Sequence, residues 1–149
     1  MFPILKKIKN NSFQEASYED KAILITSLMI ECAKSDENFT EKEGKLIKSI
    51  LKKKLKLNEE EVNNCYSESI KISDNSVEIY SLTKDIRENF SKEEILMIFE
   101  YSWEIILSDE IIDDFEASMM TKLTGLFHLT GKESAQARNS AKESINKKI

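Results

Sequence analysis

The sequence predicts an all-α fold, and three observations lead to that prediction. Glycine and proline contribute only four of the 149 residues, whereas average usage would give roughly 18. β-Sandwiches and barrels need these residues in their many turns, so the shortage argues against such folds. Helix-capping pairs also recur along the chain, and the apolar residues between them follow a helical period. A single domain of about seven helices suits this length and pattern.

Capping pairs set the expected helix boundaries. A Ser, Thr or Asn followed three residues later by an acid satisfies N–H groups in the first helical turn. Such pairs are Ser17/Asp20, Thr40/Glu43, Asn58/Glu61, Ser91/Glu94 and Thr130/Glu133, with Asp113/Glu116 as a variant and a further start near residues 74–76. The expected helices are 18–34, 41–56, 59–70, 77–89, 92–107, 114–128 and 131–146. Residues 1–17 are then an N-terminal extension, and residues 18–147 form the helical domain.

Two of these helices are expected to form the centre of the bundle. Residues 18–34 and 92–107 are apolar over most of their circumference, which is typical of helices surrounded by others. Trp103 is expected to anchor the core between them. Three methionines at helical spacing, Met97, Met119 and Met120, are also predicted to be core residues.

The formal charge of −5 conceals a strong segregation of charge. Residues 17–43 carry −4 and residues 58–116 carry −13, whereas residues 44–57 contain six lysines and no acid. The acidic majority disfavours nucleic-acid binding, which needs a basic surface. For the lysine-rich helix, a solvated face is favoured over a surface for anionic lipid or an acidic partner.

Cysteine usage and hydropathy predict a cytoplasmic protein. Cys32 and Cys65 are isolated within apolar helical patterns, which favours buried, reduced thiols. No apolar run approaches the length of about 18 residues that a transmembrane helix needs. The apolar and basic stretch Met1–Lys9 is too short for a signal peptide. A frayed terminus or a short extra helix there is favoured over docking to a membrane surface, although peripheral attachment to the inner face of the membrane stays open.

An internal repeat appears when the chain is aligned with itself so that residues 30–43 face residues 103–116. Three acids in each copy then coincide, and the pairs are Glu31/Glu104, Asp36/Asp109 and Glu43/Glu116. We call this the repeat alignment. Each copy is predicted to be a buried helix, a short acidic loop and an amphipathic helix, with a pseudo-two-fold axis relating the copies.

The doubled motif resembles the tellurite-resistance TerB family, over about residues 20–140. Its copies are Lys34-Ser-Asp-Glu-Asn-Phe-Thr-Glu-Lys-Glu43 and Leu107-Ser-Asp-Glu-Ile-Ile-Asp-Asp-Phe-Glu116, with Trp103-Glu104 before the second and a segment resembling the family's middle helix at Val77–Lys84. The chain differs in carrying Glu37 and Glu110 where the family usually has Gly. The resemblance implies a TerB-like helical fold and a non-enzymatic role in stress response at the cytoplasmic face of the membrane.

The repeated acids are candidate ligands of a divalent cation such as Ca²⁺, which prefers several oxygen ligands. The candidates are Glu31, Asp36, Glu43, Glu104, Asp109 and Glu116. Glu31 and Glu104 fall in the last turn of a helix, where the macrodipole disfavours a carboxylate, so each is expected to have a partner. The simpler interpretation, helix capping and loop bracing without an ion, is favoured. The spacing excludes an EF-hand, because neither loop has Gly at the sixth position or Glu at the twelfth.

These observations favour a binding module over an enzyme. His128 is the single histidine, and no catalytic triad or metal-hydrolase motif is present. The leading hypothesis is a stress-response module, with no required cofactor, that binds a divalent cation, a partner protein, or both through its acidic loops. The alternative is a metal-free interaction or self-association domain, similar to the amino-terminal region of DjlA-type co-chaperones. A homo-oligomer stays open, and an enzyme using paired carboxylates as acid and base is the weakest hypothesis.

Overall fold

The computed structural model describes residues 18–34, 40–74, 78–108 and 114–146. Within this part of the chain every regular element is helical, as the sequence predicts. The helices are α2 (Tyr18–Lys34), α3 (Glu41–Lys53), α4 (Glu59–Asp74), α5 (Ile79–Asn89), α6 (Lys92–Leu107), α7 (Asp114–Leu126) and α8 (Gly131–Asn146).

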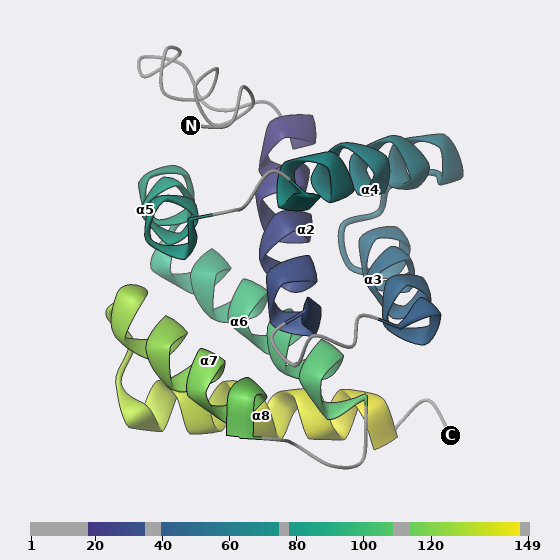
Figure 1. Cartoon of the computed structure of the whole chain (residues 1–149). Helices are drawn as coiled ribbons and strands as arrows, with labels where there is room; N and C mark the ends of the chain where they lie inside the picture. Colours follow the sequence, from purple (N-terminus) through teal and green to yellow (C-terminus); the bar gives the residue numbers. More distant parts are fainter. Residues whose placement is uncertain (1–17, 35–39, 75–77, 109–113, 147–149) are drawn as a thin grey trace.

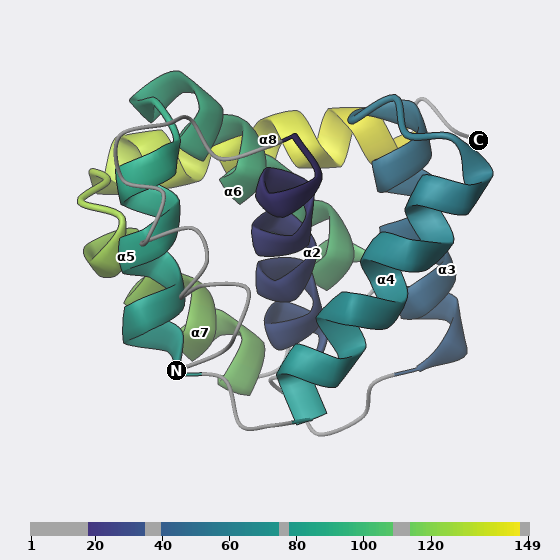
Figure 2. The same cartoon turned by 90° about the horizontal axis from the view of Figure 1, so that it is seen from above.

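Helices α2 and α6 form the centre of the bundle, and the predicted central pair is confirmed. Residues 22–30 of α2 are all buried, as are residues 101–106 of α6. Figures 1 and 2 show α3 and α4 on one side of α2, and α5 and α7 on the other. Each buried Leu, Ile or Phe contributes roughly 1.5–3 kcal/mol through removal from water, so this pair dominates the stability of the fold.

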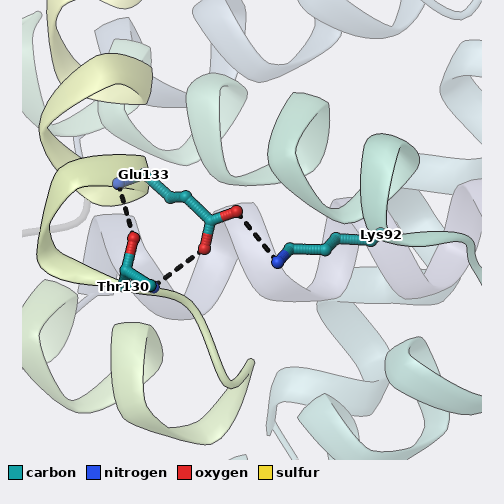
Figure 3. A network of polar contacts seen from close by, with 3 residues as sticks. All are labelled: Lys92, Thr130 and Glu133. Atoms are coloured by element: carbon teal, nitrogen blue, oxygen red, sulfur yellow. Dashed lines mark hydrogen bonds and ion pairs between the residues drawn. The ribbon is translucent and has the colours of Figure 1, made fainter.

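Each central helix has one principal neighbour. Helix α4 packs along α2, and α8 packs along α6. In addition α3 contacts α6 and α7 contacts α2, so each amphipathic helix touches the central helix of the other copy. The start of α8 is held by Lys92 at the start of α6, which forms an ion pair with Glu133 at 3.0 Å (Figure 3).

The helix boundaries follow the internal repeat. In the repeat alignment the last residue of α2, Lys34, coincides with the last residue of α6, Leu107. Helices α3 (Glu41–Lys53) and α7 (Asp114–Leu126) coincide at both ends in the same alignment. The repeat in sequence is therefore also a repeat of helix boundaries, while the pseudo-two-fold axis stays a prediction.

Two helices end earlier than predicted, because the chain turns into a left-handed conformation. Helix α3 ends at Lys53 instead of residue 56, and Lys56 has a φ of 58°. The Leu57 amide then donates to the Leu51 carbonyl at 3.2 Å, which closes the turn after α3. Helix α7 likewise ends at Leu126 instead of residue 128, and His128 has a φ of 58°.

Two other boundaries and one core residue also differ from prediction. Helix α4 continues to Asp74 and α5 begins at Ile79, where residues 70 and 77 were expected. Met120 is buried and Met119 is half-buried, but Met97 is 51% exposed. The core prediction for Met97 is therefore wrong, because no described helix covers that side of the first half of α6. Trp103, Cys32 and Cys65 are buried as expected.

Candidate binding site at the acidic helix ends

Four of the six predicted site residues lie at helix ends next to the acidic loops. Glu31 and Glu104 occupy the last turns of α2 and α6. Glu43 and Glu116 occupy the first turns of α3 and α7. The other two predicted ligands, Asp36 and Asp109, lie outside the described residues, as do Glu37 and Glu110. We call the four described carboxylates the acidic helix ends.

Three of the acidic helix ends are almost completely buried. The exposed fraction is 0% for Glu43 and 1% for both Glu104 and Glu116, whereas Glu31 is half-buried. Glutamate is among the residues least often buried, because removing its charge from water is costly unless other groups compensate it. Burial of this kind at repeated positions marks this end of the bundle as the candidate site.

Glu43 takes part in the predicted capping box. The Thr40 amide and hydroxyl each donate to Glu43 Oε1 at 3.0 Å, and the Glu43 amide donates to Thr40 Oγ1 at 3.2 Å. The negative carboxylate also suits the positive end of the α3 dipole. The capping interpretation of Glu43 is therefore confirmed. For Glu116, the proposed cap Asp113 lies outside the described residues.

Capping alone does not account for the burial of Glu43. Equivalent boxes join Asn58 to Glu61, Ser91 to Glu94 and Thr130 to Glu133. In those boxes Glu61 and Glu94 are exposed and Glu133 is half-buried. A capping glutamate thus functions at the surface elsewhere in this chain, and among these four capping boxes it is the glutamate of the Thr40–Glu43 box that is fully buried.

Glu31 has the partner that its position at a helix end led us to expect. Ser73 Oγ on α4 donates to Glu31 Oε1 at 2.9 Å, and Lys34 Nζ donates to Ser73 Oγ at 2.8 Å. Burial raises the pKa of Glu31 above its ordinary value, while the Ser73 hydrogen bond and the Lys34 charge oppose that rise. Sequence reasoning missed Ser73, because no local pattern connects two residues so far apart along the chain.

The two copies approach each other at this end of the bundle. Lys42 Nζ in the first turn of α3 donates to the Ser108 carbonyl after α6 at 3.3 Å. Burial raises the pKa of the Cys32 thiol on α2 to about 12; a hydrogen bond with Ser102 opposes the rise, and the Glu31 and Glu116 charges add to it. Glu116 on α7 therefore lies close enough to α2 to act on Cys32 electrostatically. Lys42 was not predicted, and no sequence pattern links it to Ser108.

The described residues do not form a metal site by themselves. In the part of the chain that the structure describes, no three His, Cys, Asp or Glu side chains gather so that they could hold a metal ion. A cation site would therefore need Asp36 and Asp109 from the adjoining loops. The buried thiol of Cys32, with its raised pKa, is also unsuited to nucleophilic chemistry.

Comparison with known proteins supplies the family. The model of the family described as tellurite resistance protein TerB matches residues 22–139, which include both copies of the acidic motif. The chain belongs to the TerB family. No curated protein matches this TerB chain significantly, and no solved structure does. None of the described TerB helices is long and apolar enough to cross a membrane.

Proposed function

We propose that this TerB chain is a non-catalytic, cytoplasmic module of the tellurite-type stress response that binds a divalent cation at the acidic helix ends. The observation that carries the proposal is the burial of Glu43, Glu104 and Glu116, each at most 1% exposed. Carboxylate oxygens are preferred ligands of hard divalent cations, and a bound cation would add to the interactions that these side chains already make within the protein. The same face would present the cation-loaded loops to a partner protein.

The proposed ligand set combines the two copies. Glu43 and Glu116 begin the helices that follow the acidic loops, and Asp36 and Asp109 belong to those loops. Oxygen ligands of this kind suit Ca²⁺ or Mg²⁺. Because α3 contacts α6 and α7 contacts α2, loading with a cation would join the copies across the central pair.

A metal-free interaction domain is the second candidate. It is favoured by the Thr40–Glu43 capping box and by the Glu31–Ser73–Lys34 hydrogen bonds, which employ two predicted ligands without an ion. In this case the acidic face would dock a basic surface of a partner or of a second copy. Electrostatic docking of that kind weakens as salt is added.

Calorimetric titration distinguishes the two candidates. Ca²⁺, Mg²⁺, Mn²⁺ and Zn²⁺ are titrated separately into chelator-treated protein, with Asp36→Asn/Asp109→Asn as the loop variant. The cation proposal expects saturable binding of at least one ion, with affinity lowered at least about tenfold in the variant. Absence of binding, or equal binding by both proteins, would overturn it and leave the metal-free candidate.

A second pair of variants separates capping from cation binding. Glu43→Gln keeps a side-chain oxygen that can accept from the Thr40 amide but removes the charge. Glu94→Gln makes the same change in the exposed capping box of α6. Cation affinity is expected to fall only in Glu43→Gln, and growth on tellurite to suffer only in that variant. A fall in affinity of equal size in both variants would contradict a role for Glu43 as a ligand.

A further inference from the structure

An apolar groove lies between the first halves of α2 and α6, away from the acidic helix ends. Its cavity volume is about 180 Å³. An engineered apolar cavity of about 150 Å³ binds benzene, so this groove has room for one aromatic or two aliphatic side chains. We call it the α2–α6 groove; its apolar lining comprises Ala22, Ile25, Leu55, Phe90, Met97, Ile98 and Tyr101.

The walls of the α2–α6 groove are held in place by local contacts. Lys21 Nζ lies 5.4 Å from the centre of the Phe90 ring in a cation–π contact. Glu94 on the opposite rim is held in the capping box with Ser91. Met97 lines this fixed groove while 51% of its surface is exposed. A rigid apolar groove with an exposed methionine is typical of a surface that receives another segment.

We propose that the N-terminal segment of this same chain, Met1–Phe13, occupies the α2–α6 groove. The first described helix begins at Tyr18, and Ala22 of the groove is only about 6 Å further along its axis. The 17 residues before Tyr18 can span up to about 56 Å when extended. The segment is therefore tethered next to the groove at a high effective concentration, which favours it over any separate partner.

The composition of the segment matches the groove. Its apolar residues Met1, Ile4, Leu5 and Ile8 follow the i, i+3, i+4, i+7 spacing of one helix face. Pro3 is compatible with the first turn of a helix. A helix of this kind could place one apolar face in the groove and leave its lysines outside, and grooves bind amphipathic helices in this way.

Charge favours the same occupant. Lys6, Lys7 and Lys9 follow the first apolar residues of the segment. The α6 rim carries the exposed Glu94, while Lys21 on the α2 rim is held over the Phe90 ring. Opposite charges on the segment and on the rim fix the orientation of docking, even where each pair adds little affinity.

Reactivity of a thiol at Met97 tests the proposal in the full chain. Met97→Cys is labelled with a maleimide, alone and combined with Leu5→Asp/Ile8→Asp, while Cys32 and Cys65 are buried. A segment docked about 90% of the time lowers the labelling rate about tenfold, so the aspartates should restore the fast rate. Tyr80→Cys, on α5 at a residue 61% exposed, is the matched control and should label equally fast in both backgrounds.

Three results would overturn the proposal. Equal labelling of Met97→Cys with and without the aspartates would show that the segment does not cover the groove. Labelling of Met97→Cys that slows as the protein concentration rises, together with a dimer in sedimentation, would assign the groove to a second copy of the chain. Binding of the chain to vesicles of anionic lipid that the aspartates abolish, with no change in Met97→Cys labelling, would assign the segment to the membrane surface.

Discussion

The first unit, α2–α3–α4, and the second unit, α6–α7–α8, repeat their helix boundaries but not their packing chemistry. Small polar side chains join α2 to α4: Thr26 Oγ1 lies 3.2 Å from Cys65 Sγ, and Ser69 Oγ donates to the Ile23 carbonyl at 3.4 Å. Between α6 and α8 there is instead a cation–π contact, with the Arg138 guanidinium 5.3 Å from the centre of the Trp103 ring. Helices at matching positions of the repeat alignment therefore meet their principal neighbours through different kinds of contact.

The two units share the repeated acids, although the contacts between their helices differ. Glu31 is half-buried and bonded to Ser73, while its counterpart Glu104 is 1% exposed. The exposed fraction is 0% for Glu43 and 1% for its counterpart Glu116. The two units therefore keep acids at matching positions while the burial and the contacts of these acids differ.

The largest effect on stability is expected from alanine substitutions at Phe99 and Thr26, two positions that the repeat alignment matches. Phe99 is fully buried with its ring edge-on to Trp103 and Phe127. Phe99→Ala is expected to lower the free energy of unfolding by about 3–5 kcal/mol, because it leaves a cavity in the core. Thr26→Ala loses the hydroxyl contacts to the Ala22 carbonyl at 2.7 Å and to Cys65 Sγ at 3.2 Å, and should cost about 1–2 kcal/mol.

Urea denaturation followed by circular dichroism measures both losses. The far-UV spectrum in the absence of urea serves as the control that both variants fold. Equal destabilisation by Phe99→Ala and Thr26→Ala would contradict the distinction between an aromatic and a polar core position.

The pH dependence of stability is expected to have opposite signs for one glutamate in each unit. Burial raises the pKa of Glu31, so the folded state binds its proton more tightly than the unfolded state. Its contribution to stability therefore decreases as the pH rises from the ordinary pKa of 4.5 through the raised value. Hydrogen bonds from the Thr130 amide and from Lys92 lower the pKa of Glu133. The contribution of Glu133 to stability is therefore present above pH 4.5 and is lost as the pH falls through the lowered pKa.

Urea midpoints measured from pH 3 to 8 compare Glu31→Gln and Glu133→Gln with the wild type. Relative to wild type, Glu31→Gln should gain stability as the pH rises, and Glu133→Gln should gain it as the pH falls. Parallel curves for the three proteins would contradict both assignments.

The smallest effect concerns the left-handed residues that end α3 and α7. Lys56 and His128 both have a φ of 58°, which disfavours a side chain with a β-carbon. Lys56→Gly and His128→Gly are each expected to raise the free energy of unfolding by about 1 kcal/mol. Thermal melts measure the gain, and Lys52→Gly within α3 should instead lose about 1 kcal/mol. A loss in all three variants would show that the lysine and histidine side chains matter more than the backbone.

Local patterns explain why most of the fold was predictable. Each capping box connects residues three apart, so Thr40/Glu43 and Ser91/Glu94 could be recognised from the sequence and are present in the structure. Left-handed helix ends at Lys56 and His128 were not predicted, because neither residue is the glycine that usually marks such a turn. Lys56 and His128 therefore gave no sequence signal of a left-handed helix end.

The candidate site was only partly predictable for a related reason. The repeat alignment identified Glu31, Glu43, Glu104 and Glu116, but it could not supply their burial. Ser73 and Lys42 reach the site from other parts of the chain, and tertiary packing alone brings them there. Met97 was predicted to be buried and is exposed, because a helical apolar spacing does not reveal whether another helix covers that face.

The stability of the full chain as a function of Ca²⁺ concentration tests the central claim most directly. A cation that binds only the folded state raises the free energy of unfolding by about 2.7 kcal/mol at 100 times its dissociation constant. For a chain of this size the melting midpoint should therefore rise by roughly 5–10 °C in the wild type. In Asp36→Asn/Asp109→Asn, whose affinity is expected to be at least about tenfold lower, the rise at the same concentration should be at most about half as large. A midpoint that does not respond to Ca²⁺, Mg²⁺, Mn²⁺ or Zn²⁺, or that rises equally in both proteins, would contradict cation binding at the acidic helix ends.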